Sequence, residues 1–290
     1  MDESAQYEEF GTQRKLIAHM TSESWAEVPH VSYAYEPDIT DFYAAHQELA
    51  GTSKITFNTI MVKVVAEGLR NAPDLNARLE YDAETKDGRI IKYRDVNVSI
   101  PWQMPNGTMI PLTIYKVNEL SLTEISEYVS HLRTKVENTD IDEVIRILAG
   151  VAGSPPARRD NNGLTKEDVT GATVTVSNIG SLYKEQRGSF TMLEIIPPQV
   201  FAVGIGAIQE TPGVYTDEDG TKQIGIRKIL PMCLVFDHRA VDFDALIPFL
   251  KKLDEIFASP GTVRMALTTN STDLGTVRMA FAANLTIPQN

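Results

Sequence analysis

The residues best suited to chemistry lie in the segment Phe236–Asp242, where a histidine stands between an aspartate and an arginine. The segment follows an apolar run and precedes a periodic one, which predicts that His238 lies where a strand ends and a helix follows. An imidazole whose pKa lies near neutrality can take a proton from a thiol. Asp242 can cap the next helix or pair with a cation. The pattern alone also fits a structural, hydrogen-bonding histidine.

Segments spread along the chain place this motif in a wider pattern. The string DHRAVD resembles the D-H-R-x-x-D-G signature of the acyltransferase subunit of 2-oxoacid dehydrogenase complexes, a family that shares its fold with chloramphenicol acetyltransferase. Further matches follow in the family's order from residue 11 to about residue 266: GTQRKLIAHM, VPHVSYAYEPDIT, APDLNARL, MPNGTMIP followed by SLTEISEYVSHL, TVTVSNIG and IIPPQVFAVGIG. So many matches in one register are specific for this fold.

The resemblance implies an acyltransferase that moves an acyl group between coenzyme A (CoA) and a dihydrolipoyl thiol. A thiol with a pKa of about 8.5 is mostly protonated at neutral pH, so the reaction needs a base, and His238 matches the family's histidine. Ser177 matches the serine that donates to the oxyanion, a contribution of about 3–4 kcal/mol. Asp242 matches a carboxylate that pairs with an arginine of the opening helix, here Arg14. Arg239 is expected to support the site or to remain solvated.

The resemblance also implies an assembly. Subunits of this family form homotrimers with active sites between two chains, so we expect His238 of one chain to meet Ser177 of its neighbour. CoA or acyl-CoA is the expected substrate. The sequence contains no lipoyl-type D-K-A turn, so the lipoyl group is expected on another chain. A core larger than a trimer, and separate lipoyl-bearing and decarboxylase subunits, stay open.

Composition and charge limit the class of protein. The 290 residues are 42% hydrophobic and 23% charged, as in ordinary globular domains. A formal net charge of −12 repels nucleic acid, anionic membranes and CoA itself, so a CoA site needs local positive charge or helix N-termini. No Cys/His cluster has the spacing of metal ligands. A single cysteine and the lack of a signal peptide or long apolar run favour a cytoplasmic location.

The order of patterns predicts an α/β (α+β) fold, a chloramphenicol-acetyltransferase-like two-layer sandwich with a large mixed sheet. Thr12 is expected to cap the first helix, and Ser121 with Glu124 to form a capping box. Helices are predicted over 12–26, 40–50, 58–72, 121–138, 140–152 and 242–258. Strands are predicted over 28–35, 90–102, 109–116, 171–180, 200–208 and 226–237, with a polar turn over 215–223 before the last.

One catalytic domain is predicted over residues 11–267, after an extension over 1–10 and before a tail over 268–290. Residues 138–163 resemble an insertion, which would form a lid, an acceptor entrance or a partner surface. Phe243 stands where the family has glycine, in the loop behind the histidine. These departures keep two alternatives open: a stand-alone CoA-dependent acyltransferase with another small acceptor, and a non-catalytic trimeric core protein.

Other candidate residues receive structural interpretations. Cys233 lies in an apolar strand without an adjacent base, which favours a buried thiol over a nucleophile. His30 lies on a strand and either borders a channel or belongs to the core or surface. His19, His46 and His131 lie on or near predicted helices and are expected at or near the surface.

Overall fold

The computed structural model describes residues 6–50, 55–104, 107, 109–140, 144–145, 148, 162–217 and 219–259. Its helices are α1 (Thr12–Glu27), α2 (Thr40–Ala50), α3 (Phe57–Asn71), α4 (Leu122–Glu137), α6 (Lys166–Val169), the 3-10 turn η1 (Ile179–Ser181) and α7 (Phe243–Ala258). Its strands are β1 (His30–Tyr35), β2 (Ala77–Tyr81), β3 (Gly88–Lys92), β4 (Val98–Gln103), β5 (Met109–Ile114), β6 (Val174–Asn178), β7 (Phe201–Ile205), β8 (Gln209–Thr216), β9 (Lys222–Ile229) and β10 (Met232–Asp237).

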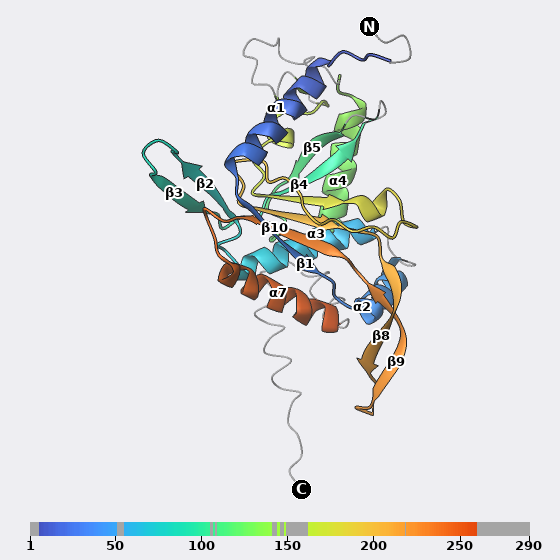
Figure 1. Cartoon of the computed structure of the whole chain (residues 1–290). Helices are drawn as coiled ribbons and strands as arrows, with labels where there is room; N and C mark the ends of the chain where they lie inside the picture. Colours follow the sequence, from blue (N-terminus) through green and yellow to red (C-terminus); the bar gives the residue numbers. More distant parts are fainter. Residues whose placement is uncertain are drawn as a thin grey trace.

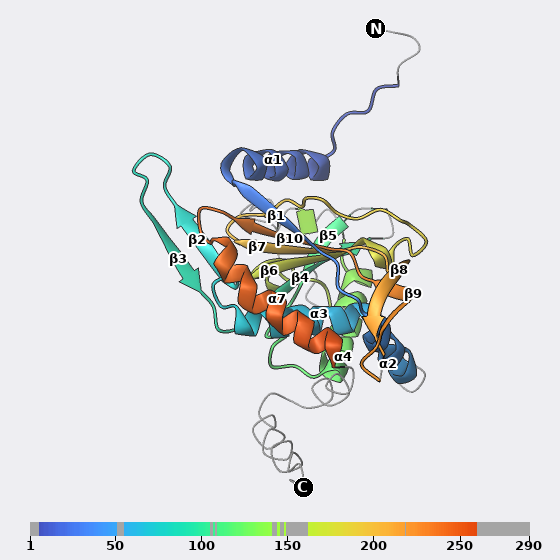
Figure 2. The same cartoon turned by 60° about the horizontal axis from the view of Figure 1, so that its bottom comes forward.

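A mixed sheet of six strands organises the molecule in the order β1-β10-β7-β6-β4-β5. Strands β6 and β7 run parallel, and β10 runs antiparallel to β7. Figure 2 shows α3, α4 and α7 on one side of this sheet and α1 on the other. The large mixed sheet covered by helices was predicted from the order of the sequence patterns, and this prediction is confirmed.

The face that carries α3 and α7 holds the larger core. Every residue of β7 and β10 is buried, as expected for apolar, β-branched strands at the centre of a sheet. Phe201 of β7 meets Phe249 of α7 edge to face, with ring centroids 5.3 Å apart. Gly68 lets the two helices approach, because a Cβ there would lie 2.6 Å from the Phe249 ring.

The opposite face carries a second, smaller apolar cluster. It comprises Val28, Ile195, Ala202, Cys233 and Val235, with Phe190, Met192 and Leu193 packed against it. Helix α1 adds little to this cluster, since Ser24 is its only buried residue. Most of α1 therefore makes no core contact within its own chain.

The predicted strand over 226–237 is wrong as a single element. Strand β9 ends at Ile229 and β10 begins at Met232, with Pro231 between them. Proline has no N–H to continue a ladder, and β9 pairs instead with β8, which the sequence pattern did not predict. The β8–β9 hairpin projects from the sheet, as does the β2–β3 hairpin (Figure 1).

The predicted helix caps have mixed outcomes. The Ser121–Glu124 capping box of α4 is confirmed, with both the hydroxyl and the backbone N–H of Ser121 donating to the carboxylate at 2.7 Å. Thr12 as a cap is wrong, because Gly11 holds that position and offers no side chain.

The predicted helix over 140–152 falls largely outside the described residues, as do most of the insertion over 138–163 and all of the tail over 268–290. The proposed domain limits stay a prediction.

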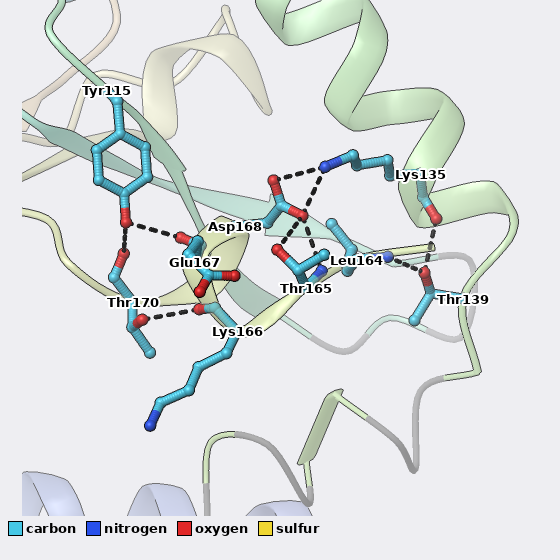
Figure 3. A network of polar contacts seen from close by, with 9 residues as sticks. All are labelled: Tyr115, Lys135, Thr139, Leu164, Thr165, Lys166, Glu167, Asp168 and Thr170. Atoms are coloured by element: carbon cyan, nitrogen blue, oxygen red, sulfur yellow. Dashed lines mark hydrogen bonds and ion pairs between the residues drawn. The ribbon is translucent and has the colours of Figure 1, made fainter. Parts of the chain in front are cut away.

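A polar network fixes the short helix α6 against α4 (Figure 3). The Lys135 ammonium donates to both carboxylate oxygens of Asp168, at 3.0 and 2.8 Å. The backbone N–H and the hydroxyl of Thr165 donate to the same carboxylate at 2.8 and 2.9 Å. Nearby, the Thr139 hydroxyl accepts from the backbone of Leu164. These bonds orient the chain where it enters β6.

The Asp168 network predicts a pH-dependent contribution to stability. Burial alone would raise the pKa of Asp168, but the bonds from Lys135 and Thr165 outweigh burial and hold it below its usual range. A lowered carboxyl pKa adds stability that is present above the unfolded pKa, near 3.9, and lost as the pH falls through the folded pKa. Asp168→Asn is therefore expected to lower the free energy of unfolding by about 2–3 kcal/mol at pH 7.

Urea denaturation at pH 7 and at pH 3 checks this prediction. The wild type and Asp168→Asn should differ at pH 7, and the difference should be smaller at pH 3, below the unfolded pKa. Glu127→Gln, an exposed carboxylate on α4, is the matched control and should change stability by less than about 0.5 kcal/mol. Equal stability of Asp168→Asn and wild type at pH 7 would contradict the role assigned to the network.

Candidate active site

His238 is the first residue after β10 and is held by backbone contacts from both sides. Its N–H donates to the carbonyl of Pro29 at 3.1 Å. The preceding residue, Asp237, donates its N–H to Val200, and its carbonyl accepts from the N–H groups of Ala240 and Val241. The chain therefore makes a tight, hydrogen-bonded turn at the end of β10. The His238 side chain is 50% exposed, so a reacting group can reach it.

The contacts of the His238 ring set its tautomer. Nδ1 lies 3.2 Å from the carbonyl oxygen of Val241 and 3.2 Å from Oδ1 of Asp242. Both atoms are acceptors, so Nδ1 carries the proton and Nε2 keeps its lone pair. The Phe236 ring meets the imidazole edge to face at 5.8 Å. A histidine in this state can accept a proton at Nε2.

A buried ion pair braces the turn from behind. The Asp237 side chain is 1% exposed, and Arg239 donates to it through Nε, at 3.1 and 3.2 Å, and through Nη2, at 2.8 Å. The Arg239 guanidinium also lies over the ring of Tyr81 in β2, 5.4 Å from its centroid. The hydrogen bonds to Asp237 raise the pKa of Arg239. Sequence reasoning missed Asp237 as a site residue and considered Arg239 alone.

This bracing predicts that Asp237→Asn lowers the free energy of unfolding by about 2–4 kcal/mol, because it leaves the partly buried Arg239 without its counter-charge. Chemical denaturation at pH 7 measures the change. Asp244→Asn, an exposed aspartate in the first turn of α7, serves as the control and should be near neutral. A Asp237→Asn variant as stable as the Asp244→Asn control would contradict the bracing role.

The predicted pairing of Asp242 with Arg14 does not occur within the chain. Asp242 contacts His238, has an 80% exposed side chain, and makes no side-chain cap to α7 although it holds the N-cap position. Arg14 is exposed on α1 and pairs with no carboxylate among the described residues. Within one subunit, Asp237 with Arg239 supplies the bracing expected of Asp242 with Arg14.

Phe243 leaves this arrangement intact. It is the first residue of α7 and packs against Tyr33 of β1, with ring centroids 5.3 Å apart. The hydrogen bonds of the His238 turn are all present beside it. A bulky residue in place of the family's glycine is thus accommodated on the outside of the turn.

Ser177 lies on β6, directly opposite Gly204 of β7. It is partly exposed, and its hydroxyl makes no hydrogen bond to any residue that the structure describes. A Cβ at position 204 would lie 2.7 Å from Leu193, so glycine lets the loop before β7 close over this face of the sheet. The free hydroxyl can donate to an oxygen that develops negative charge.

One chain does not bring His238 and Ser177 together. Ser177 is level with Gly204, and Gly204 is level with Cys233 of β10. His238 lies five residues beyond Cys233, which places it about 17 Å further along the sheet and about 10 Å across it. That separation exceeds the reach of a single reacting thioester. The two side chains can share a reaction only if they come from different copies of the chain.

A cavity of about 700 Å³ opens at the end of the sheet opposite His238. Asn178, the last residue of β6, lines it together with Gly180 and Ser181, and Thr56 and Asn58 line it at the start of α3. The Asn178 amide donates to the side chain of Asn58 at 3.2 Å, which joins these two walls. Such a volume fits a small-molecule ligand.

The cavity also carries positive charge. Lys184 and Lys228 line it, and the Thr56 hydroxyl caps α3 by accepting from the N–H of Thr59. Lys228 pairs with Glu210 at 2.7 Å, whereas Lys184 has no carboxylate partner among the described residues. A lysine beside a helix N-terminus binds phosphate groups well. This is the local positive charge that an anionic substrate requires on an acidic protein.

The remaining candidates have different outcomes. Cys233 is 2% exposed and burial raises its pKa, so the buried, unreactive thiol is confirmed. His30 accepts from the N–H of Ile195 through Nε2 at 3.0 Å and stacks on Trp25, a structural role. The prediction that His46 lies at or near the surface is wrong, since the residue is 7% exposed and lines the cavity.

The described residues contain no cluster of metal ligands and no helix long and apolar enough to cross a bilayer.

Comparison with known proteins agrees on one family. The model described as 2-oxoacid dehydrogenases acyltransferase (catalytic domain) matches residues 3–144 and 154–265. The lipoamide acyltransferase component of the branched-chain alpha-keto acid dehydrogenase complex of Pseudomonas aeruginosa is 29% identical over 256 residues, 86% of this chain and 51% of that protein. The dihydrolipoyllysine-residue acetyltransferase component of the pyruvate dehydrogenase complex of Mycobacterium bovis is 28% identical over 236 residues, 79% and 37% of the two lengths. The chain thus spans about half of the length of the first relative and less of the second.

Solved structures show the same fold. A probable dihydrolipoamide acetyltransferase from Listeria monocytogenes superposes with a TM-score of 0.66 at 20% identity, covering 92% of this chain and 97% of that one. A truncated catalytic core of the 2-oxoacid dehydrogenase multienzyme complex from Thermoplasma acidophilum gives 0.65 at 22% identity, covering 88% and 99%. At these identities the likeness establishes the arrangement of helices and strands.

Proposed function

Because this chain belongs to the 2-oxoacid dehydrogenase acyltransferase family through its catalytic domain, as its motifs predicted, we propose that it moves an acyl group between CoA and a dihydrolipoyl thiol carried on another chain. The observation that carries the proposal is the His238 turn. Its exposed imidazole has Nδ1 committed to two acceptors, which leaves Nε2 as a base. An imidazole with an unprotonated Nε2 can take the proton of a thiol as the thiol attacks the thioester.

The proposed reaction has two steps. Nε2 of His238 takes the proton of the attacking thiol, and the thiolate sulfur bonds to the carbonyl carbon of the acyl thioester. The carbonyl oxygen becomes an oxyanion, to which the Ser177 hydroxyl donates. The intermediate then expels the other sulfur, which recovers the proton from the imidazolium. Asp242 and the Val241 carbonyl keep the ring oriented throughout.

We infer that the working unit is a homotrimer in which each site combines two chains. The separation of His238 and Ser177 along and across the sheet supports this inference, because one chain cannot close the site. Helix α1 supports it too, since nearly all of its surface is left without core contacts in its own chain. The relatives that bear the matched domain are named as components of larger complexes. A lipoyl-bearing partner chain is therefore part of the proposal.

We place CoA in the cavity at the end of β6, where Asn178, the residue after Ser177, forms part of the wall. Its thiol would have to pass round the end of β6 to reach the Ser177 hydroxyl. Lys184 and the N-terminus of α3 would hold its phosphates, which offsets the repulsion expected from a net charge of −12. The dihydrolipoyl thiol would then approach from the side of the neighbouring chain's His238.

A coupled thiol assay tests the function. Purified protein is incubated with acetyl-, propionyl- or branched-chain acyl-CoA and free dihydrolipoamide, and both released CoA and acylated dihydrolipoamide are quantified. Equal amounts of the two products, formed by a stable oligomer, are expected. If turnover occurs only with a different acceptor, the proposed dihydrolipoyl acceptor is wrong and the protein is a CoA-dependent acyltransferase for that other acceptor. No turnover with any acceptor by a well-folded oligomer would refute an enzymatic role and favour a core protein.

A further inference from the structure

We propose that His30 and Ser24 are positioning residues for acyl transfer. Together they hold the backbone of Ile195, and through it the segment 189–195, beside the hydroxyl of Ser177. The inference rests on the proposed function, because the surroundings of Ser177 affect the rate only if its hydroxyl takes part in the reaction. Both residues act through Ile195 and make no contact with the substrate.

The segment 189–195 packs directly beside Ser177. Ser177 is level with Gly204 of β7, and residues that are level on neighbouring strands point to the same face of a sheet, with the strands about 4.8 Å apart. A Cβ at position 204 would lie 2.7 Å from Leu193 and 2.8 Å from Phe190. These two side chains therefore border the space in which a thioester at the Ser177 hydroxyl must lie.

Both backbone polar groups of Ile195 are bound by side chains from the start of the chain. The Ser24 hydroxyl, on α1, donates to the Ile195 carbonyl at 2.6 Å, and both residues are fully buried. The Ile195 N–H donates to Nε2 of His30, on β1, at 3.0 Å. Residues 189–195 form no other hydrogen bond with the part of the chain that the structure describes. These two bonds are therefore the polar anchors of the segment.

Burial of the Ile195 side chain does not orient the segment by itself. The side chain packs with Ala202, Cys233 and Val235 in the smaller apolar cluster. Apolar contact is non-directional, whereas a hydrogen bond weakens steeply away from its preferred geometry. One bond to the N–H and one to the carbonyl therefore fix the direction of the backbone that leads back to Leu193.

His30 is itself held in place by α1. Its ring stacks on the indole of Trp25, with centroids 5.6 Å apart and an interplanar angle of 28°. Because Nε2 accepts from Ile195, the proton of the neutral ring lies on Nδ1. Trp25 and Ser24 both belong to α1, which lies on this side of the sheet (Figure 2). Helix α1 and β1 thus brace the segment beside Ser177 together.

Two variants of His30 separate the hydrogen bond from the stacking. His30→Phe keeps a ring against Trp25 but removes the acceptor for the Ile195 N–H. His30→Gln loses the ring, while its side-chain carbonyl can take the place of Nε2. We expect His30→Phe to lower kcat by about 10–100-fold, the effect of a displaced catalytic geometry. His30→Gln should recover most of this loss.

Steady-state kinetics with CoA and dihydrolipoamide measures these changes, and a thermal melt checks the fold. The KM for CoA should stay within about twofold of wild type, because an oxyanion donor acts in the transition state and not in substrate binding. Ser24→Ala should lower kcat by about tenfold for the same reason as His30→Phe. His131→Phe on α4 and Ser22→Ala on α1 change exposed residues and are the matched controls, with kcat expected within about twofold of wild type.

A double-mutant cycle tests whether His30 acts through Ser177. In the Ser177→Ala background, His30→Phe should change kcat by less than about threefold, because the hydroxyl that the segment serves is already gone. A residue that supports the fold alone would lower kcat by the same factor in both backgrounds. Ser24→Ala gives the same cycle if His30→Phe does not fold.

The outcomes separate this inference from the function. The inference is overturned, and the acyltransferase proposal stands, if folded His30→Phe and Ser24→Ala keep the wild-type kcat. It is also overturned if His30→Gln is no more active than His30→Phe, or if the losses multiply with that of Ser177→Ala. A folded wild-type protein without acyl transfer, or a Ser177→Ala variant with full kcat, would overturn the proposed role of Ser177 as well.

Discussion

Replacing His238 by alanine is expected to lower kcat for acyl transfer by about 10²–10⁴-fold, the range for loss of a positioned general base. The KM for CoA should change little, because His238 is assigned proton transfer and does not line the cavity assigned to CoA. The side chain is half exposed, so its removal opens no void in the core. Steady-state kinetics with both thiols saturating measures the effect, and a thermal melt confirms the fold.

The pH dependence of the rate of the same variant tests directly whether His238 acts as the general base. Without a base, only the thiolate already present in solution can attack. Its fraction rises about tenfold per pH unit below a thiol pKa of about 8.5. The rate of His238→Ala should therefore climb steeply from pH 6 to pH 8.5. His131→Ala, an exposed histidine on α4, is the matched control and should behave as wild type. A variant that retains kcat within tenfold of wild type at pH 7 would remove His238 from the mechanism.

The place of His238 was predictable because the sequence changes character at that point. The buried run of β10 ends at Asp237, and the helical periodicity of α7 begins at Phe243. The role of Asp237 was not read from the same segment. Its signal was the alternation along β10, since Asp237 follows Cys233 and Val235 onto one face of the sheet. A carboxylate on that face needs a cation, and Arg239 is two residues away.

Two other features of the structure were not predicted from the sequence: the β8–β9 hairpin and the burial of His46. In the β8–β9 hairpin, the short alternation of Ile224 and Ile226 along β9 does not mark a buried face, because both side chains are exposed, as is Val214 of β8. The burial of His46 did have a signal, because it lies four residues after Phe42 and so shares its buried helix face. The prediction of a surface location followed the polarity of histidine and did not use its helical spacing from Phe42.

The distance between Ser177 and His238 depends on information that no local pattern contains. The order of β10, β7 and β6 in the sheet, and the registers between them, arise from long-range pairing. Sequence motifs identified both residues, and the resemblance implied that they meet across a subunit boundary. The strand order supplies a physical reason, since it keeps the two side chains apart in one chain. The catalytic roles themselves stay predictions until the variants are measured.

Ser177→Ala is expected to lower kcat by about 10²–10³-fold, the usual effect of removing one oxyanion donor. The hydroxyl makes no hydrogen bond to a described residue, so its loss should leave the free energy of unfolding within about 0.5 kcal/mol of wild type. Kinetics at saturating acyl-CoA and dihydrolipoamide measure the first quantity, and urea denaturation measures the second. A loss of activity that merely follows a loss of stability would contradict the assigned role.

Combining the two inactive variants tests where the site lies. In a closed trimer, an interface is active when His238 comes from a Ser177→Ala chain and Ser177 comes from a His238→Ala chain. Random assembly of equal amounts gives each interface a one-half chance for each chain, so co-expression should recover about one quarter of the wild-type activity. A mixture of His238→Ala with the double variant contains no intact interface and should stay inactive. If both residues acted within one chain, no mixture would recover activity, because every chain carries one defect.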